Sequence, residues 1–153
     1  MMFSSLLSRG TVIADLNSTD KKGAIRELVE KLYECKAIPQ KDTIEKALLD
    51  RERLGSTGIG NQVAIPHAKC DNIGDLVAAF GKSESGVEFD ALDRKKVHYV
   101  FLLLAPKGEA GKHLKALARI SRLVRIDGFC SKLKSLSTEE DILEALNQAE
   151  QSL

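Results

Sequence analysis

The sequence lacks several features that mark membrane, exported or fibrous proteins. It contains no tryptophan, only 5% aromatic residues and three prolines among 153 residues. Its longest nearly uninterrupted apolar stretch, residues 97–105, is about half as long as a membrane-spanning helix. The N-terminus also lacks the long apolar segment of a signal peptide. We therefore expect a soluble cytoplasmic protein that is not exported and does not insert into a membrane.

Cysteine is scarce, and there is almost no net charge. Cys35, Cys70 and Cys130 are widely spaced and form no CxxC pair, which disfavours both a disulfide framework and a zinc site. We expect Cys70 to be a small packing residue. The 23 lysines and arginines nearly balance the 22 aspartates and glutamates, which gives a net charge of +1. Since the basic residues form no stripe, nucleic acid is not an expected partner.

The apolar pattern of the sequence predicts a layered fold. Apolar residues make up 43% of the chain and recur at helical spacing in several segments, while residues 97–104 are apolar at nearly every position. Such a run is typical of a central strand that is covered on both faces. We predict an α/β fold, in which a mixed β-sheet is flanked by helices on both faces in a single three-layer domain. The predicted strands are residues 11–16, 63–65, 76–80 and 97–104. The predicted helices are 21–32, a second that begins at 40–42 and ends before Gly55, 113–124, 129–136 and one opened by a capping box at 137–140.

The most unusual segment is residues 51–67, which ends in Ala64-Ile65-Pro66-His67. Gly55, Gly58 and Gly60 give backbone N–H groups close access to an anion, and Ser56 and Thr57 add hydroxyl donors. The segment has no Lys-Ser or Lys-Thr pair after its last glycine, and no third glycine of a dinucleotide fingerprint, so nucleotide binding is disfavoured. Taken alone, it is more often a glycine-rich turn that leads into a strand.

His67 gives this segment a different meaning. Pro66 ends the short strand before it, so the imidazole is expected at a strand end, where functional residues of open α/β sheets collect. The segment from Arg51 to His67 resembles the active-site motif of the mannitol/fructose-type IIA domains of the phosphoenolpyruvate-dependent sugar phosphotransferase system. Within that family the chain is most similar to the stand-alone nitrogen-regulatory IIA proteins, over residues 5–149.

The resemblance implies three site residues. It implies that His67 accepts a phosphoryl group, that Arg51 neutralises the group, and that His113 is the second active-site histidine. Arg53 and Lys69 are alternative sources of positive charge. A neutral imidazole is nucleophilic near pH 7, and phosphoryl transfer needs mainly positioning and charge neutralisation, so the chemistry agrees with these roles. Gln62 stands where many family members have glycine, and we therefore expect no special backbone freedom there.

The resemblance also implies partners. They are an HPr-like histidine phosphocarrier of the nitrogen-regulatory branch (NPr) and regulatory targets in nitrogen metabolism and potassium transport, and no cofactor or metal is expected. The alternative is a sugar-specific IIA that passes phosphate to a IIB domain. A metal hydrolase that uses His67, His98 and His113 is disfavoured because no close metal-binding spacing exists. We expect His98 to be structural or merely exposed.

Overall fold

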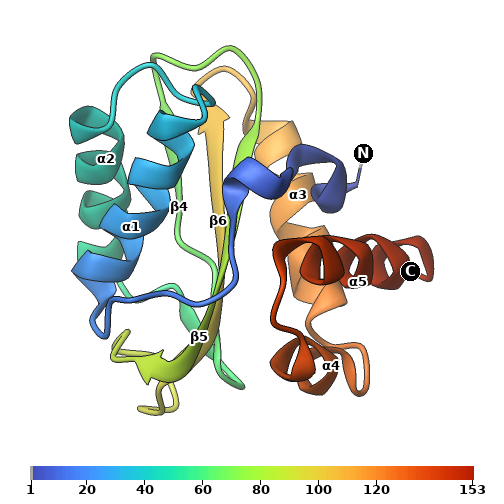
Figure 1. The fold of residues 1–153 in the computed structure, drawn as a ribbon. Coiled ribbons are helices and arrows are strands. Elements are labelled where there is room, and N and C mark those ends of the chain that lie inside the picture. The colour runs from blue at the N-terminus through green and yellow to red at the C-terminus, as the bar shows by residue number, and fades with distance from the viewer. Residues whose placement is uncertain (1) are drawn as a thin grey trace.

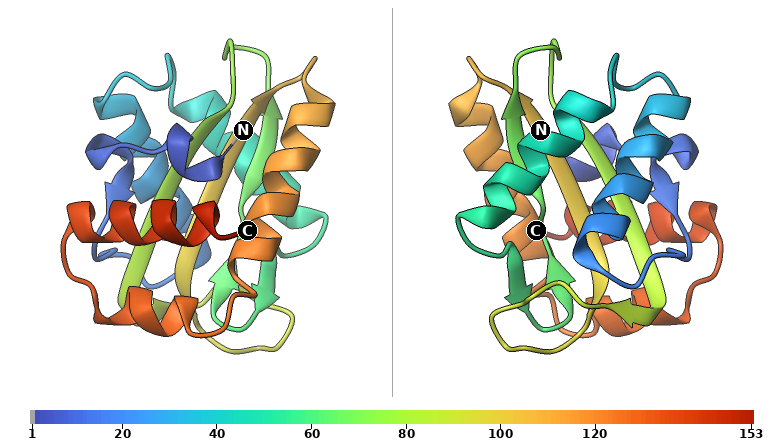
Figure 2. Two further views of the ribbon diagram at one scale, coloured as in Figure 1. Left: turned by 90° about the vertical axis from the view of Figure 1, so that its right-hand side faces the viewer. Right: turned by 90° about the vertical axis from the view of Figure 1, so that its left-hand side faces the viewer.

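The computed structural model describes residues 2–153 as three layers. A six-stranded mixed sheet, with strand order β1-β5-β6-β3-β2, forms the middle layer, and β4 also pairs with β6. Helices α1 and α2 cover one face and α3, α4 and α5 cover the other (Figures 1 and 2). The predicted α/β fold with helices on both faces is therefore confirmed.

The sheet has six strands, of which only β5 and β6 are long. They are β1 (Val12–Ile13), β2 (Gly58–Gly60), β3 (Val63–Ala64), β4 (His67–Cys70), β5 (Val77–Val87) and β6 (Val97–Pro106). Strand β6 runs antiparallel to β5 and parallel to both β3 and β4. Its side chains are buried in both core clusters, as expected for the central strand.

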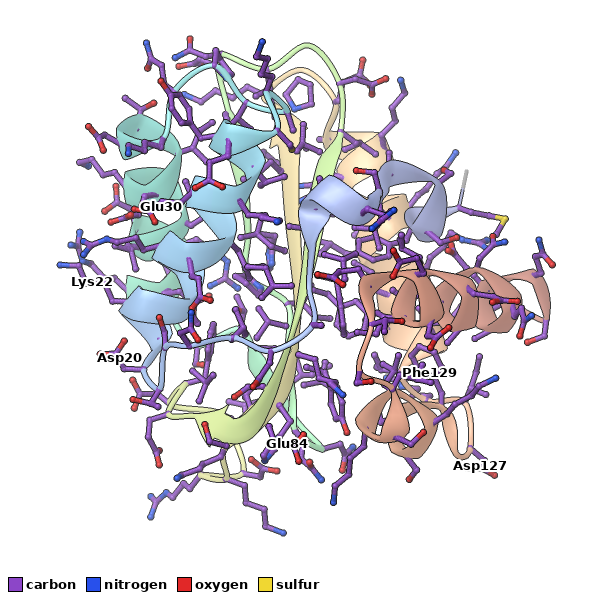
Figure 3. The ribbon with its side chains drawn as sticks, in the orientation of Figure 1. Asp20, Lys22, Glu30, Glu84, Asp127 and Phe129 are labelled. Atoms are coloured by element: carbon purple, nitrogen blue, oxygen red, sulfur yellow. The ribbon has the colours of Figure 1, made fainter. Side chains whose placement is uncertain are left out.

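Five α-helices follow the apolar pattern of the sequence. They are α1 (Lys21–Glu34), α2 (Asp42–Arg53), α3 (Ala110–Leu123), α4 (Phe129–Ser135) and α5 (Glu139–Gln151). Asp20 caps helix α1 from the position just before it, because its carboxylate accepts a hydrogen bond from the backbone N–H of Gly23 at 2.7 Å. Lys22 and Glu30 lie on the exposed side of this helix, away from the sheet (Figure 3).

Some predicted boundaries were wrong. The strand at residues 11–16 is only Val12–Ile13, since Thr11 belongs to a short 3-10 helix, η2 (Arg9–Thr11), and pairing with β5 covers only Val12 and Ile13. The glycine-rich loop contains strand β2, which pairs antiparallel with β3. Strand β5 continues well beyond residue 80, since its polar second half still pairs with β6. Helix α5 is capped by the Thr138 hydroxyl, one residue later than predicted.

Pro66 interrupts the pairing along β6, but the pairing resumes after it. Strands β3 and β4 lie on either side of Pro66, and both pair parallel with β6. The carbonyl of Pro66 accepts the backbone N–H of Leu103 at 3.0 Å, although proline itself has no N–H to donate. His67 is therefore the first residue of β4, and not the residue that follows the last strand pairing as predicted.

A buried carboxylate attaches the N-terminal segment to the last helix. Glu150 of α5 is 1% exposed and accepts the backbone N–H groups of Phe3 at 2.5 Å and Ser4 at 2.7 Å. Arg119 of α3 donates to the same carboxylate at 2.7 Å. Within residues 2–153, no helix is long and apolar enough to cross a membrane.

Candidate functional site

The site is a groove at the edge of the sheet, where β4 lies between α2 and α3. These two helices lie on opposite faces of the sheet (Figure 1), so the groove receives side chains from both helical layers. Its volume is about 720 Å³, which is in the range of small-molecule sites. It is lined by Ala47, Asp50, Arg51, Leu54, His67, Ala68, Lys69, Ala110, His113, Leu114 and Leu117.

His67 is held by its own backbone. Its Nδ1 lies 2.7 Å from the carbonyl oxygen of Ile65. Because a carbonyl can only accept, this contact favours the tautomer with hydrogen on Nδ1 and a lone pair on Nε2. Burial and the charge of Arg51 lower the pKa of His67, although the Ile65 hydrogen bond and Glu52 oppose the shift. The ring is therefore neutral near pH 7, and Nε2 is free to attack.

His113 faces His67 from the first turn of α3. The two ring centroids are 5.4 Å apart and the ring planes meet at 65°. His113 is 5% exposed, and its Nε2 is buried without a hydrogen-bond partner among the described residues. Burial, and then the charges of His67 and Lys69, lower the pKa of His113 to about 4. Helix α3 begins at Ala110, earlier than predicted, but His113 still lies near its positive end.

Arg51 reaches the groove from the last turn of α2. Its Nη1 donates to the carbonyl of Gly55 at 2.9 Å, which folds the guanidinium back over the loop that follows the helix. One donor is used in this contact, and the others remain for a ligand. The structure thus brings together the three predicted site residues, Arg51, His67 and His113, around one groove.

The predicted phosphate-loop residues lie outside the groove. Ser56 donates its hydroxyl to the Phe89 carbonyl at 2.9 Å, and the Thr57 hydroxyl donates to Glu52. A Cβ at Gly58 would lie 2.8 Å from Ala91, so glycine is needed there for close packing. Of the predicted set Gly55, Ser56, Thr57, Gly58 and Gly60, only Gly55 is hydrogen-bonded to a groove-lining side chain, because its carbonyl accepts from Arg51. The hydroxyls hold the loop and do not point at His67.

Sequence reasoning missed the importance of Glu52. This residue is 7% exposed, pairs with Lys21 at 3.1 Å and accepts the backbone N–H of Thr57 at 3.0 Å. It therefore links the start of α1 to the loop after Arg51. Its position was detectable, because Ile44, Leu48 and Glu52 recur every four residues on the buried side of α2.

The expectation that Gln62 needs no special backbone freedom was wrong. Its φ is 69° and that of Asn61 is 55°, so both residues of the β2–β3 turn are in the left-handed region that glycine adopts most easily. The carbonyl of Gln62 accepts the backbone N–H groups of His98 at 2.8 Å and Tyr99 at 3.0 Å. These hydrogen bonds to β6 explain why the strained turn persists with a glutamine.

The other singled-out residues do not belong to the groove. His98 bonds through Nδ1 to the Ser83 carbonyl at 2.7 Å and does not line the groove. Cys70 is buried in the core beneath α1 and α2, and burial raises the pKa of its thiol. In the part of the chain that the structure describes, no cluster of three His, Cys, Asp or Glu side chains could hold a metal ion.

Comparisons with known proteins agree on one family. The family model described as "Phosphoenolpyruvate-dependent sugar phosphotransferase system, EIIA 2" matches residues 5–149. A nitrogen regulatory protein of Bradyrhizobium diazoefficiens is 36% identical over 146 residues, which are 95% of each chain. The fructose-specific EIIABC component of Bacillus subtilis is 34% identical over 97% of this chain, which spans 23% of that protein. The crystal structure of nitrogen regulatory protein IIA-Ntr from Neisseria meningitidis superposes with a TM-score of 0.86 at 29% identity, covering 94% of this chain and 97% of that one.

Proposed function

Because this chain belongs to the EIIA 2 family of the phosphoenolpyruvate-dependent sugar phosphotransferase system, we propose that His67 accepts a phosphoryl group on Nε2 from an HPr-like histidine phosphocarrier. The observation that carries this proposal is the contact of 2.7 Å between His67 Nδ1 and the Ile65 carbonyl. That contact leaves Nε2 as the nucleophilic nitrogen, and His67 lines the groove.

The transfer moves one phosphoryl group between two imidazoles. The lone pair of His67 Nε2 attacks phosphorus, and the N–P bond of the carrier breaks as its electron pair returns to the carrier's ring. The Nδ1 proton of His67 stays in its hydrogen bond to Ile65, so no separate base is needed. The lowered pKa of His67 keeps the ring in its nucleophilic, neutral form.

Arg51 and His113 serve the transferred group from two sides. The remaining guanidinium donors of Arg51 neutralise charge on the phosphoryl oxygens, and a fork of donors suits two oxygens at once. His113 is neutral because its pKa is about 4, and the phosphoryl group supplies the hydrogen-bond partner that its buried Nε2 lacks within the described chain. Both groups are fixed before the donor arrives, as electrostatic preorganisation requires.

The rim of the groove suits the docking of the carrier. Leu54 and Leu114 line the groove and are 85% and 70% exposed. Large apolar side chains at this level of exposure favour a protein contact. A carrier histidine that delivers phosphate to His67 would place its own surface against both leucines, and a transient complex needs only a modest interface.

We further propose that the protein acts in the cytoplasm as a regulator whose phosphorylation state selects partners in nitrogen metabolism and potassium transport. The similarity to nitrogen regulatory proteins supports this role, since it extends over 95% of both chains. Phosphorylation adds about two negative charges, which can exclude a partner that fits the bare imidazole. The alternative is transfer to a sugar-specific IIB, favoured by the similarity to a fructose-specific EIIABC component.

Two variants test the acceptor. We expect His67→Ala to abolish the gain of one phosphoryl mass after incubation with phosphoenolpyruvate and the upstream carriers. His98→Gln is the matched control, because His98 lies outside the groove, and it should label like the wild type. Full labelling of the His67 variant would move the acceptor elsewhere, with His113 examined next.

Affinity capture separates regulation from transport. Phosphorylated wild type and the unphosphorylated His67→Ala variant serve as baits in the same cell extract. We expect at least one regulatory target to bind the unphosphorylated form more tightly. Equal recovery on both baits, or a sugar-specific IIB as the main catch, would replace the regulatory role with the transport role.

A further inference from the structure

Besides Arg51 of α2, a second cationic side chain lines the groove, and it lies on the same strand as His67. Lys69 is exposed, belongs to β4 and lines the groove with Arg51, His67 and His113. Because side chains alternate along a strand, residues two apart point to the same face, about 6.6 Å from each other. A lysine side chain is long enough to span that separation.

The burial of the two neighbours of Lys69 along β4 indicates which way its side chain points. Ala68 and Cys70 are buried in the core cluster beneath α1 and α2. His67 and Lys69 therefore point away from that core, toward the side from which His113 of α3 approaches. The charge of Lys69 also contributes to the lowered pKa of His113, as expected for a cation close to that ring.

The other charges around the groove have partners. Asp50, the one carboxylate of the groove lining, is bound by Lys46 at 2.8 Å and by Arg53 at 2.6 Å. Lys107 and Lys112 beside the groove also have acidic partners. Among residues 2–153, Lys69 and Arg51 form no ion pair, so two uncompensated cations flank His67.

The charge of a phosphoryl group matches this arrangement. Such a group carries about two negative charges on three oxygens. Arg51 supplies one positive charge, while His113 supplies a hydrogen bond without charge because it is neutral at pH 7. We propose that the Lys69 ammonium pairs with the phosphoryl oxygens on His67 and stabilises the phosphorylated form. This inference rests on the proposed phosphorylation of His67.

The experiment compares wild type, Lys69→Gln, Lys69→Arg and Lys107→Gln, each phosphorylated in two ways. The carrier is one donor, and potassium phosphoramidate is the other. With phosphoramidate, its P–N bond breaks and ammonia leaves as the bond from phosphorus to Nε2 forms. Lys107→Gln is the matched control, because it removes the same charge from a lysine that is paired with Asp71 at 3.1 Å.

Two measurements follow. Phosphorus NMR titration gives the pKa of the phosphoryl group, which should rise by about one unit in Lys69→Gln because a neighbouring cation is lost. The equilibrium constant for transfer from the carrier should fall about tenfold in the same variant. Lys69→Arg should stay within about threefold of wild type, and Lys107→Gln should match wild type in both measurements.

The outcomes separate this inference from the function on which it rests. If the wild type is labelled on His67 but Lys69→Gln matches Lys107→Gln in both measurements, the role of Lys69 is overturned and the proposed function stands. A wild type that is labelled on His67 by neither donor overturns the proposed function as well. Slower labelling by the carrier but not by phosphoramidate, with an unchanged equilibrium constant and an unchanged phosphoryl pKa, would assign Lys69 to carrier contact, and it would likewise overturn the pairing.

Discussion

Two buried titratable side chains on the same face of the sheet have opposite surroundings. Glu150 is 1% exposed and has three hydrogen-bond donors, from Phe3, Ser4 and Arg119. His113 is 5% exposed, and its Nε2 has no partner within the described chain. An unpaired buried polar atom costs about 1–3 kcal/mol. The saturated group holds the fold together, whereas the unsaturated one is available to a ligand.

Their pKa values reflect the same difference. Burial alone would raise the pKa of Glu150, but hydrogen bonds from Arg119, Ser4 and Phe3 outweigh burial and lower it. For His113, burial and the charges of His67 and Lys69 all act in one direction, toward a pKa of about 4. Substitution of the two residues should therefore have opposite effects on stability.

The largest effect is expected from Glu150→Leu. The change leaves the Arg119 guanidinium and the N–H groups of Phe3 and Ser4 without their buried acceptor, which should lower the free energy of unfolding by about 3–5 kcal/mol. Urea unfolding at pH 7 measures this loss. Glu144→Leu, at an exposed position of the same helix, is the control and should change stability by about 0.5 kcal/mol or less. Equal losses in the two variants would mean that the buried hydrogen bonds of Glu150 do not stabilise the fold.

The next largest effect is expected on the pH dependence of stability, through His113. Its folded pKa of about 4 lies below the unfolded value of 6.5, so the unfolded chain binds more protons between these values. Stability is fully present above pH 6.5 and falls toward pH 4, by up to about 3 kcal/mol from this residue. His113→Leu should remove that part of the acid sensitivity. Urea unfolding at several pH values between 4 and 7.5 measures the slope.

The same variant tests the comparison at pH 7. Since leucine removes an unpaired polar atom, His113→Leu should be at least as stable as wild type there, while phosphoryl transfer slows. A variant that loses stability at pH 7 and keeps the wild-type acid slope would mean that His113 is a structural residue like Glu150.

Arg51→Lys tests whether the groove needs the forked guanidinium and not merely a positive charge. The lysine keeps the charge but loses the fork of donors, one of which holds the Gly55 carbonyl at 2.9 Å. We expect phosphoryl transfer to slow about tenfold, which corresponds to about 1.4 kcal/mol. Quenched-flow labelling at fixed carrier concentration measures the rate. Arg53→Lys is the control, because Arg53 pairs with Asp50 and does not line the groove; an equal slowing in both would refute the role of the Arg51 fork.

The smallest effect is expected at the β2–β3 turn, which belongs neither to the groove nor to the surroundings of Glu150. Gln62 has a φ of 69°, and a side chain in this region is less favourable than glycine. Gln62→Gly should raise the free energy of unfolding by about 0.5–1 kcal/mol and leave phosphoryl transfer unchanged. Thermal unfolding with paired labelling assays measures both. Asn61→Gly should gain less, since asparagine tolerates this conformation; a slower transfer in Gln62→Gly would connect the turn to the groove.

Local signals in the sequence were sufficient for much of the fold. The spacing of apolar residues located α1 and α2, and the unbroken apolar run located β6, because these patterns arise within one element. Strand β4 was not predicted, since its four residues become a strand only through pairing with β6. Proline lacks a ladder donor, and no local rule shows that pairing resumes after Pro66.

The site residues could likewise be predicted only in part from the sequence. The sequence pattern singled out His67, and the resemblance to a known family implied its role and added Arg51 and His113, all of which line the groove. The hydroxyls of Ser56 and Thr57 were expected to point at an anion, but they bond to Phe89 and Glu52. Those partners come from other parts of the fold, and their competition for a donor cannot be foreseen from the loop alone.

The contact between Glu150 and the backbone of Phe3 and Ser4 also brings the two ends of the described chain together, on the side of α3 and α5 in Figure 1. Joined ends that lie close in space need only a short linker, and closing a short loop costs little entropy. The chain is therefore suited to circular permutation, with new termini at an exposed turn such as Asn61 and Gln62. A cut at this turn would separate Arg51 from His67 along the permuted chain, whereas a cut before Arg51 or after His67 would leave them in one uninterrupted segment, so a comparison of the two permutants would measure how far the groove depends on chain continuity.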